Sequence, residues 1–396
     1  MKGKQIIPIL CFGILMVGLG SNDSLRGIFA PIFQERYTLS DSQLSLIVTI
    51  SYVGNLLFLS LGGKLLDTFD RKKVTLCIIG IWILALLMNL FTDSYLFILI
   101  SMFLALGAST LLNTTINILT PVVCAGYAGF MVNVFFFIQG LGTSGSQLLL
   151  GRYAFSYAGW KGINVILLVI ALVSVLLFVA MKIPARQEAP TALNADKRQP
   201  EQPSFAAPAH SPSPAVFWLL AAMLGCYFIG EHGIMNWFLS YCISAFSMDS
   251  NRASLCLSIF WGGMTIGRLV FAPMVQKLGT VNSIRLFGGI GTLLFTVGIL
   301  LGASGIYLVG ISGFAISILY PTIILFFQEL YPANVAATRT GAIISVATIA
   351  DILFNLLFGV LCGSLGYRIS FLILPVAMIF FYIIYLSLSG KTRAAA

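Results

Sequence analysis

The sequence has little charge and almost no histidine. Only 9% of its 396 residues are Asp, Glu, Lys or Arg, against about a quarter in an ordinary soluble domain, while 59% are hydrophobic. A water-soluble fold of this composition would lack a polar surface. With His210 and His232 alone, a histidine-rich metal site is excluded, and no nucleophile triad or phosphate-binding glycine loop is present. We therefore expect neither an enzyme nor a protein that needs a cofactor or metal.

The cysteines and the basic residues have simple explanations. Seven cysteines lie almost entirely in apolar runs, without the spacing of a metal site or a disulfide framework, so we expect them to be small core residues. The net charge of +9 comes from residues spread over short segments, which argues against nucleic-acid binding and fits membrane topology.

Long apolar runs recur along the chain, and each is long enough to cross a hydrocarbon core about 30 Å thick. Continuous runs without inside-out alternation exclude a barrel and predict an all-α membrane protein. The first run follows Lys2 and Lys4 but shows no small-x-small cleavage site, so we expect it to stay in the protein. The predicted spans are 6–33, 43–66, 73–93, 95–120, 126–151, 159–182, 214–245, 252–276, 281–302, 304–330, 335–363 and 367–389.

The spans fall into two groups of six. The predicted organisation is an N-terminal half at 1–182, a linker at 183–213 rich in Pro, Ala, Gln and charge, and a C-terminal half at 214–396. Placing both termini and the linker in the cytoplasm leaves fifteen Lys and Arg inside and six outside, with Arg268 within a span. We therefore expect a multi-pass protein with cytoplasmic termini, of a bacterial inner membrane by its short loops.

This layout matches transporters built from two parallel halves, which bind a small molecule near the bilayer midplane where the halves meet. The expected partners are that small molecule, protons and the lipid bilayer, but no nucleic acid, and the expected state is a monomer.

One loop carries a family resemblance. After the second span the chain continues Gly62-Gly63-Lys64-Leu65-Leu66-Asp67-Thr68-Phe69-Asp70-Arg71-Lys72-Lys73, which resembles the loop signature of the major facilitator superfamily. In that family the loop latches the cytoplasmic side, so the resemblance implies latch roles for Gly63, Asp67, Arg71 and Lys72. Thr68 stands where a basic residue is usual and Asp70 where glycine is usual, which predicts a weaker latch.

Acids inside the spans are scarce, and such residues mark pathways because they are costly in lipid. Asp23 and Arg26 are neighbours on one face of the first span, the seventh holds Glu231 and His232, and the eleventh holds Asp351. The first and seventh helices are equivalent in a repeat of two halves. We therefore expect Asp23 and Glu231 on opposite walls of one site and predict proton coupling by Asp23, Glu231, His232 and Asp351. The structural alternative is that Asp23 only neutralises Arg26.

The seventh and eighth spans carry a narrower resemblance. Gly230-Glu231 before Trp237, followed by Trp261-Gly262-Gly263 and Gly267-Arg268, is similar to the fucose:proton symporter branch, as is Asn22-Asp23. The resemblance implies that Asp23 takes part in proton coupling. That branch has a second acid in the fourth helix, where this chain has none, so Glu231 or Asp351 would supply it unless coupling differs.

Amides and aromatic faces inside the spans predict a site for hydroxyl groups, because an amide both donates and accepts hydrogen bonds. The predicted substrate-binding residues are Asn22, Asn113, Asn117, Gln139, Tyr227, Asn236, Trp237 and Tyr320. The predicted function is proton-coupled uptake of a small neutral polar solute such as a monosaccharide. Proton-coupled efflux of lipophilic compounds is the alternative, although the fifth span lacks the Gly-Pro pair typical of such carriers. A nontransporting receptor or a membrane enzyme is a further alternative, which the missing sensor domain and the missing catalytic motifs disfavour.

Overall fold

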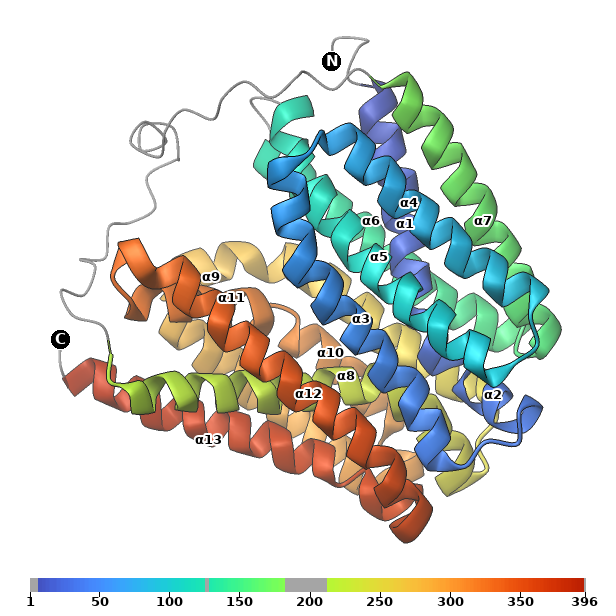
Figure 1. Ribbon diagram of the computed structural model, residues 1–396. Coiled ribbons are helices and arrows are strands. Elements are labelled where there is room, and N and C mark those ends of the chain that lie inside the picture. The colour runs from blue at the N-terminus through green and yellow to red at the C-terminus, as the bar shows by residue number, and fades with distance from the viewer. Residues whose placement is uncertain (1–5, 125–127, 182–211, 395–396) are drawn as a thin grey trace.

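The chain folds into helices throughout the part that the structure describes. This computed structural model describes residues 6–124, 128–181 and 212–394, and Figure 1 shows their arrangement. The helices are α1 (Ile6–Ile28), α2 (Ala30–Arg36), α3 (Asp41–Thr68), α4 (Arg71–Phe91), α5 (Tyr95–Val123), α6 (Ala128–Tyr153), α7 (Tyr157–Ala180), α8 (Pro214–Phe246), α9 (Ser250–Leu300), α10 (Ile306–Ile316), α11 (Leu319–Leu330), α12 (Ala333–Ser370) and α13 (Ile373–Ala394), with a 3₁₀ turn at Gly302–Ser304. The prediction of an all-helical membrane fold is confirmed.

Twelve spans emerge once two bends are taken into account. Helix α9 turns at Gly279 (φ 74°) and α12 at Gly366 (φ 75°), left-handed positions that glycine adopts without strain. Helix α9 therefore supplies two spans, whereas α12 supplies one, because only four of its residues follow Gly366 and these lead into α13. Helices α1 and α2 form one broken span, and α10 and α11 form another, which gives twelve spans in the described residues. Nine helical segments of the described chain, counting α9 once, are long and apolar enough to cross a membrane.

Local signals set the helix ends. The hydroxyl of Ser40 and the side chain of Gln43 form a reciprocal capping box at the start of α3. Asp70 caps α4 by accepting a hydrogen bond of 2.9 Å from the backbone nitrogen of Lys73. This cap gives a physical reason for an acid at Asp70, where the loop signature has glycine.

The helices form two bundles, α1 to α7 and α8 to α13 (Figure 1). The ends of the bundles where α7 ends and α8 begins are called the linker end, and the opposite ends the far end. In Figure 1 the bundles diverge toward the linker end. Residues 182–211 lie outside the described part, so the predicted division at 183–213 stays a prediction.

Close helix contacts join the halves toward the far end. A Cβ added at Gly27 of α1 would lie 2.0 Å from the carbonyl oxygen of Met235 in α8, and one at Gly359 of α12 would lie 2.3 Å from the carbonyl oxygen of Asp41 in α3. Small residues let helix backbones approach in this way. Tyr367 also donates to Asp41 across the halves at 3.2 Å. The structure is therefore closed at its far end.

Candidate functional site

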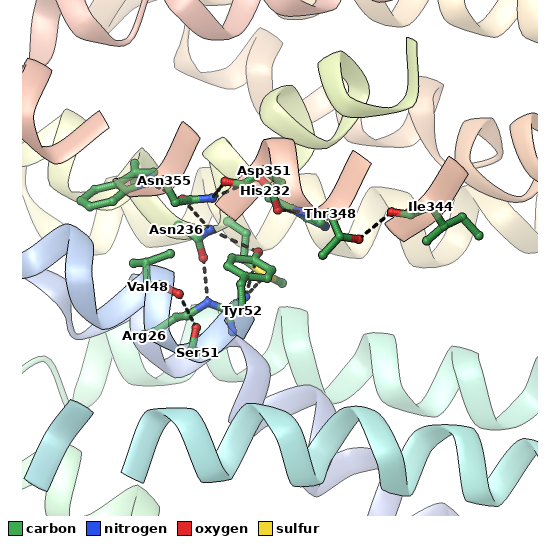
Figure 2. A network of polar contacts seen from close by, with 12 residues as sticks. Arg26, Val48, Ser51, Tyr52, His232, Asn236, Ile344, Thr348, Asp351 and Asn355 are labelled. Carbon is green, nitrogen blue, oxygen red and sulfur yellow. Dashed lines mark hydrogen bonds and ion pairs between the residues drawn. The ribbon is translucent and has the colours of Figure 1, made fainter. Parts of the chain in front are cut away.

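A buried arginine joins the two halves. Arg26 of α1 is 5% exposed, and its Nε donates a hydrogen bond of 2.8 Å to Oδ1 of Asn236 in α8 (Figure 2). Its Nη2 donates to the hydroxyl of Tyr52 in α3 at 3.1 Å, and the guanidinium lies 4.8 Å from the centre of the Tyr52 ring. A cation over an aromatic face is attracted by the ring. Arg26 therefore links α1 and α3 of one half to α8 of the other.

The network continues through amides into the C-terminal half. Asn236 Nδ2 donates to Oδ1 of Asn355 in α12 at 3.3 Å, and the indole nitrogen of Trp237 donates to the same oxygen at 2.9 Å. Asn355 Nδ2 then donates to Oδ1 of Asp351 at 3.0 Å, as Figure 2 shows. Asn236, Asn355 and Asp351 have no solvent exposure, so each of these bonds replaces water in a dry interior.

The network ends in a carboxylate and histidine pair. Oδ2 of Asp351 lies 2.6 Å from Nδ1 of His232, whose ring lies between those of Tyr52 and Phe228, with centroids 5.4 and 4.9 Å away. The side chain of His232 is 23% exposed, whereas that of Asp351 is 1% exposed. Histidine is the side chain whose charge ordinarily changes between pH 5 and 8. We refer to Arg26, Tyr52, His232, Asn236, Asp351 and Asn355 as the inter-half network.

A second polar group lies beside this network. Glu231 of α8 is 6% exposed, and its charge and that of Arg268 in α9 both act on the phenols of Tyr227 and Tyr320. Arg268 is half-buried, and its Nε donates to the carbonyl oxygen of Ser317 at 3.3 Å. We refer to Tyr227, Glu231, Arg268 and Tyr320 as the Arg268 cluster.

Asp23 lies in the N-terminal half and is held by neutral groups. It accepts hydrogen bonds from the hydroxyl of Ser109 in α5 at 2.7 Å and from Asn22 at 3.3 Å. Asn22 in turn accepts one of 3.0 Å from the indole nitrogen of Trp82. Asp23 and Arg26 share a helix face but form no ion pair among the described residues. Simple neutralisation of Arg26 by Asp23 is therefore not what this conformation shows.

Asp23 and Glu231, which are predicted to lie on opposite walls of one site, do not pair with each other in this conformation. Helices α1 and α8 do contact each other, but the residues that meet are Arg26, three residues after Asp23, and Asn236, five residues after Glu231. No described hydrogen bond or ion pair joins Asp23 to Glu231. A common site for the two acids stays a prediction.

The predicted substrate amides of the N-terminal half come together in part. Asn113 of α5 donates to Oε1 of Gln139 in α6 at 3.1 Å. The side-chain oxygens of Asn113 and Asn117 are buried and accept no hydrogen bond from the described part of the chain. These half-buried amides therefore retain acceptors for hydroxyl groups.

Three predicted substrate residues of the C-terminal half have other partners in this conformation. Trp237 is fully buried against Phe358, with ring centroids 5.1 Å apart, so it offers no free face to a solute. Asn236 uses its amide within the inter-half network. Tyr320 is half-buried and packs 5.8 Å from Phe228.

The predicted latch residues lie at the linker end. Lys72 donates two hydrogen bonds of 2.8 Å to the carbonyl oxygens of Val179 and Met181, so it closes the C-terminus of α7 within its own half. Arg71 begins α4. Gly63 and Asp67 belong to α3, but their side chains lie outside the described part of the structure. The latch role stays a prediction.

From the sequence, no site role is predicted for three members of the inter-half network. Arg26 was visible as a charge within a span, but its partners in α3 and α8 follow only from the packing of the halves. Asn355 had a usable signal, because it lies one turn after Asp351 in an apolar helix. Tyr52 had none, since a single tyrosine in an apolar span is usually a packing residue.

Comparison with known proteins agrees with this architecture. Residues 10–354 match a family model described as Major Facilitator Superfamily. The cis,cis-muconate transport protein of Acinetobacter baylyi is 28% identical over 156 residues, which are 38% of this chain and 37% of that protein. The chain thus matches little more than a third of that relative's length.

Solved transporters share the fold at low identity. The D-xylose-proton symporter superposes with a TM-score of 0.72 at 12% identity, covering 96% of each chain. The E. coli fucose:proton symporter gives a TM-score of 0.60 at 17% identity, covering 96% of this chain and 98% of its own. A nucleoside transporter gives 0.72 at 13% identity, covering 97% and 98%. These likenesses show the fold and do not single out the fucose branch.

Proposed function

Because the chain belongs to the Major Facilitator Superfamily, a family of membrane transporters, we propose that it takes up a small polar organic solute together with protons. The observation that carries the proposal is the His232 and Asp351 pair at the end of a network that crosses between the halves. A proton gained or lost there changes the charge of the C-terminal half beside Arg26 of the other half.

Protonation of the His232 and Asp351 pair can change the conformation through its effect on Arg26. The groups around His232 are Asp351, Glu231, Tyr52, Phe228 and Arg26. Without its proton the pair carries one negative charge, which attracts Arg26 and favours the closed far end. With its proton the pair is neutral and this attraction weakens. Two unit charges about 10 Å apart interact with on the order of 1 to 2 kcal/mol at an effective dielectric constant of about 20, enough for a roughly tenfold shift between conformations.

The proposed orientation follows the charge bias of the sequence. Basic residues concentrate on the linker end, so we place that end in the cytoplasm of a bacterial cell, with the protein acting as a monomer in the inner membrane. The structure then represents a conformation closed to the outside. Acid outside the cell would supply protons that favour opening.

Two observations support a hydroxylated solute. Asn113, Asn117 and Gln139 present amides in the N-terminal half, and the sequence resembles the fucose:proton symporter branch. A monosaccharide or polyol fits these groups. The match to a protein named for muconate, a dicarboxylate, favours an acidic solute as a second candidate, and the half-buried Arg268 is the residue in this chain that supports it.

Uptake into proteoliposomes under an imposed pH gradient tests the proposal. With acid outside, labelled sugars, polyols or their acids should accumulate, and a protonophore should collapse the accumulation; empty liposomes are the control. If no polar solute accumulates under this gradient while lipophilic dyes are expelled, efflux replaces uptake as the function.

A further inference from the structure

Arg268 is a cation at membrane depth with little to neutralise it. It lies in the first membrane-crossing segment of α9, eleven residues before the bend at Gly279. No acidic side chain of the described residues lies within 4.0 Å of its guanidinium, and its Nε contacts only the neutral carbonyl oxygen of Ser317. Intramembrane charges are costly unless paired, and the planar arginine fork matches a carboxylate. The geometry thus leaves room for an anion on Arg268.

Glu231 is the acid whose charge competes for this position. It is almost fully buried, and its charge acts on the phenol groups of Tyr227 and Tyr320, as does that of Arg268. Helix α13 contributes only apolar contacts there, Phe381 against Tyr227 and Met378 against Gly230. An ionised Glu231 balances Arg268 from a distance, whereas a protonated Glu231 leaves that cation without a counter-charge.

The Arg268 cluster connects to the inter-half network through stacked rings. Tyr320 packs 5.8 Å from Phe228, which stacks 4.9 Å from His232, and His232 stacks 5.4 Å from Tyr52 of the other half. A solute bound beside Tyr320 therefore lies one aromatic side chain away from the groups that join the halves. Binding of the solute can therefore affect, through these packed rings, the contact between the halves that must break when the far end opens.

We infer that the transported solute carries a carboxylate, that Arg268 binds this group with the Tyr320 hydroxyl beside it, and that Glu231 must take up a proton before it binds. This inference rests on the proposed function and names its substrate class as a hydroxylated organic acid. Two anions in one dry site repel each other, so a proton on Glu231 and a carboxylate on Arg268 enter together. The proton moves from water to a Glu231 oxygen and leaves with the solute on the other side.

Matched solutes test the substrate class. Proteoliposomes with acid outside are offered D-gluconate against D-glucose, D-galactonate against D-galactose, and glycerate against glycerol. The acids should accumulate and their neutral parents should not. Equal accumulation of the neutral parents overturns the inference but leaves proton-driven uptake standing; no accumulation of any solute overturns the proposed function itself.

Variants test the two residues. Arg268→Gln should lower uptake of the acid at least tenfold and Arg268→Lys should recover part of it, while Arg285→Gln, which removes the same charge from α9 beyond the bend, should match the wild type. In exchange without a gradient, the wild type's apparent affinity for the acid should fall about tenfold per pH unit once Glu231 ionises, whereas Glu231→Gln should give a flat profile. A sloping profile in Glu231→Gln, or equal uptake by Arg268→Gln and Arg285→Gln, contradicts the inference.

Discussion

The first helices of the two halves, α1 and α8, hold their charges in opposite ways. On α1, Asp23 is bound by a hydroxyl and an amide, and Arg26 reaches across to the other half. On α8, His232 contacts the carboxyl group of Asp351, and Glu231 acts on Tyr227, as does Arg268 from α9. The N-terminal half therefore supplies a permanent cation, and the C-terminal half supplies groups whose charge follows pH. We therefore assign the proposed proton coupling mainly to the C-terminal half.

The largest effect is expected from Glu231→Gln. This change removes the group of α8 whose proton we propose to enter with the solute, while keeping its size, so gradient-driven accumulation should fall from about tenfold per pH unit for one proton to none. Exchange across the membrane should persist, because it needs no net proton movement. Accumulation ratios and exchange rates in proteoliposomes measure both.

The matched change on α1 is Asp23→Asn, which keeps the contacts with Ser109 and Asn22 possible. It should slow transport by a few-fold and preserve the accumulation ratio. Loss of accumulation in this variant, with normal accumulation in Glu231→Gln, would contradict this expectation. It would place the coupled proton on α1 and not on α8, as the resemblance to the fucose branch implies.

An effect smaller than that of Glu231→Gln is expected where α1 and α8 touch. Gly27→Ala places a Cβ 2.0 Å from a backbone oxygen of α8, so the helices must separate and the closed far end should weaken. Transport should slow by about tenfold, equivalent to about 1.4 kcal/mol. Gly145→Ala is the control, because nothing lies within 4 Å of a Cβ added there. Equal rates in the two variants would show that this contact does not limit the cycle.

These contrasts also show what sequence alone can provide. The apolar runs and the polar break predict the spans and the two halves, because lipid demands length and hydrophobicity of each helix. Contacts between helices far apart in the chain follow no such rule. No sequence pattern predicts that Arg26 contacts Tyr52 and Asn236 and not Asp23. Trp237 is an aromatic residue of the kind that stacks on sugars, but here its indole nitrogen bonds Asn355 and its ring packs on Phe358.

The smallest effect concerns an acid outside the spans. Asp93, between α4 and α5, is 51% exposed; a hydrogen bond from Tyr157 and then one from Lys161 hold the pKa of its carboxyl below its ordinary value. A lowered pKa stabilises the fold above the ordinary value of 3.8, and this contribution disappears as the pH falls through the lowered pKa. Asp93→Asn should therefore cost about 1 kcal/mol or less near pH 7. In thermal unfolding, the melting temperatures of the variant and the wild type should converge in strong acid. A constant difference at all pH values would show that the charge of Asp93 does not cause the difference in stability.

The central claim is that protonation of the C-terminal half releases the contact between the halves. Spin labels at Phe91→Cys on α4 and Leu301→Cys after α9, both exposed and both at the far end, report the separation of the halves in a cysteine-free background. The distance between the labels should be short at pH 8 and shift toward longer values at pH 5, with Asp351→Asn fixed near the longer values at both. A distance distribution that does not change with pH in the wild type would contradict the claim.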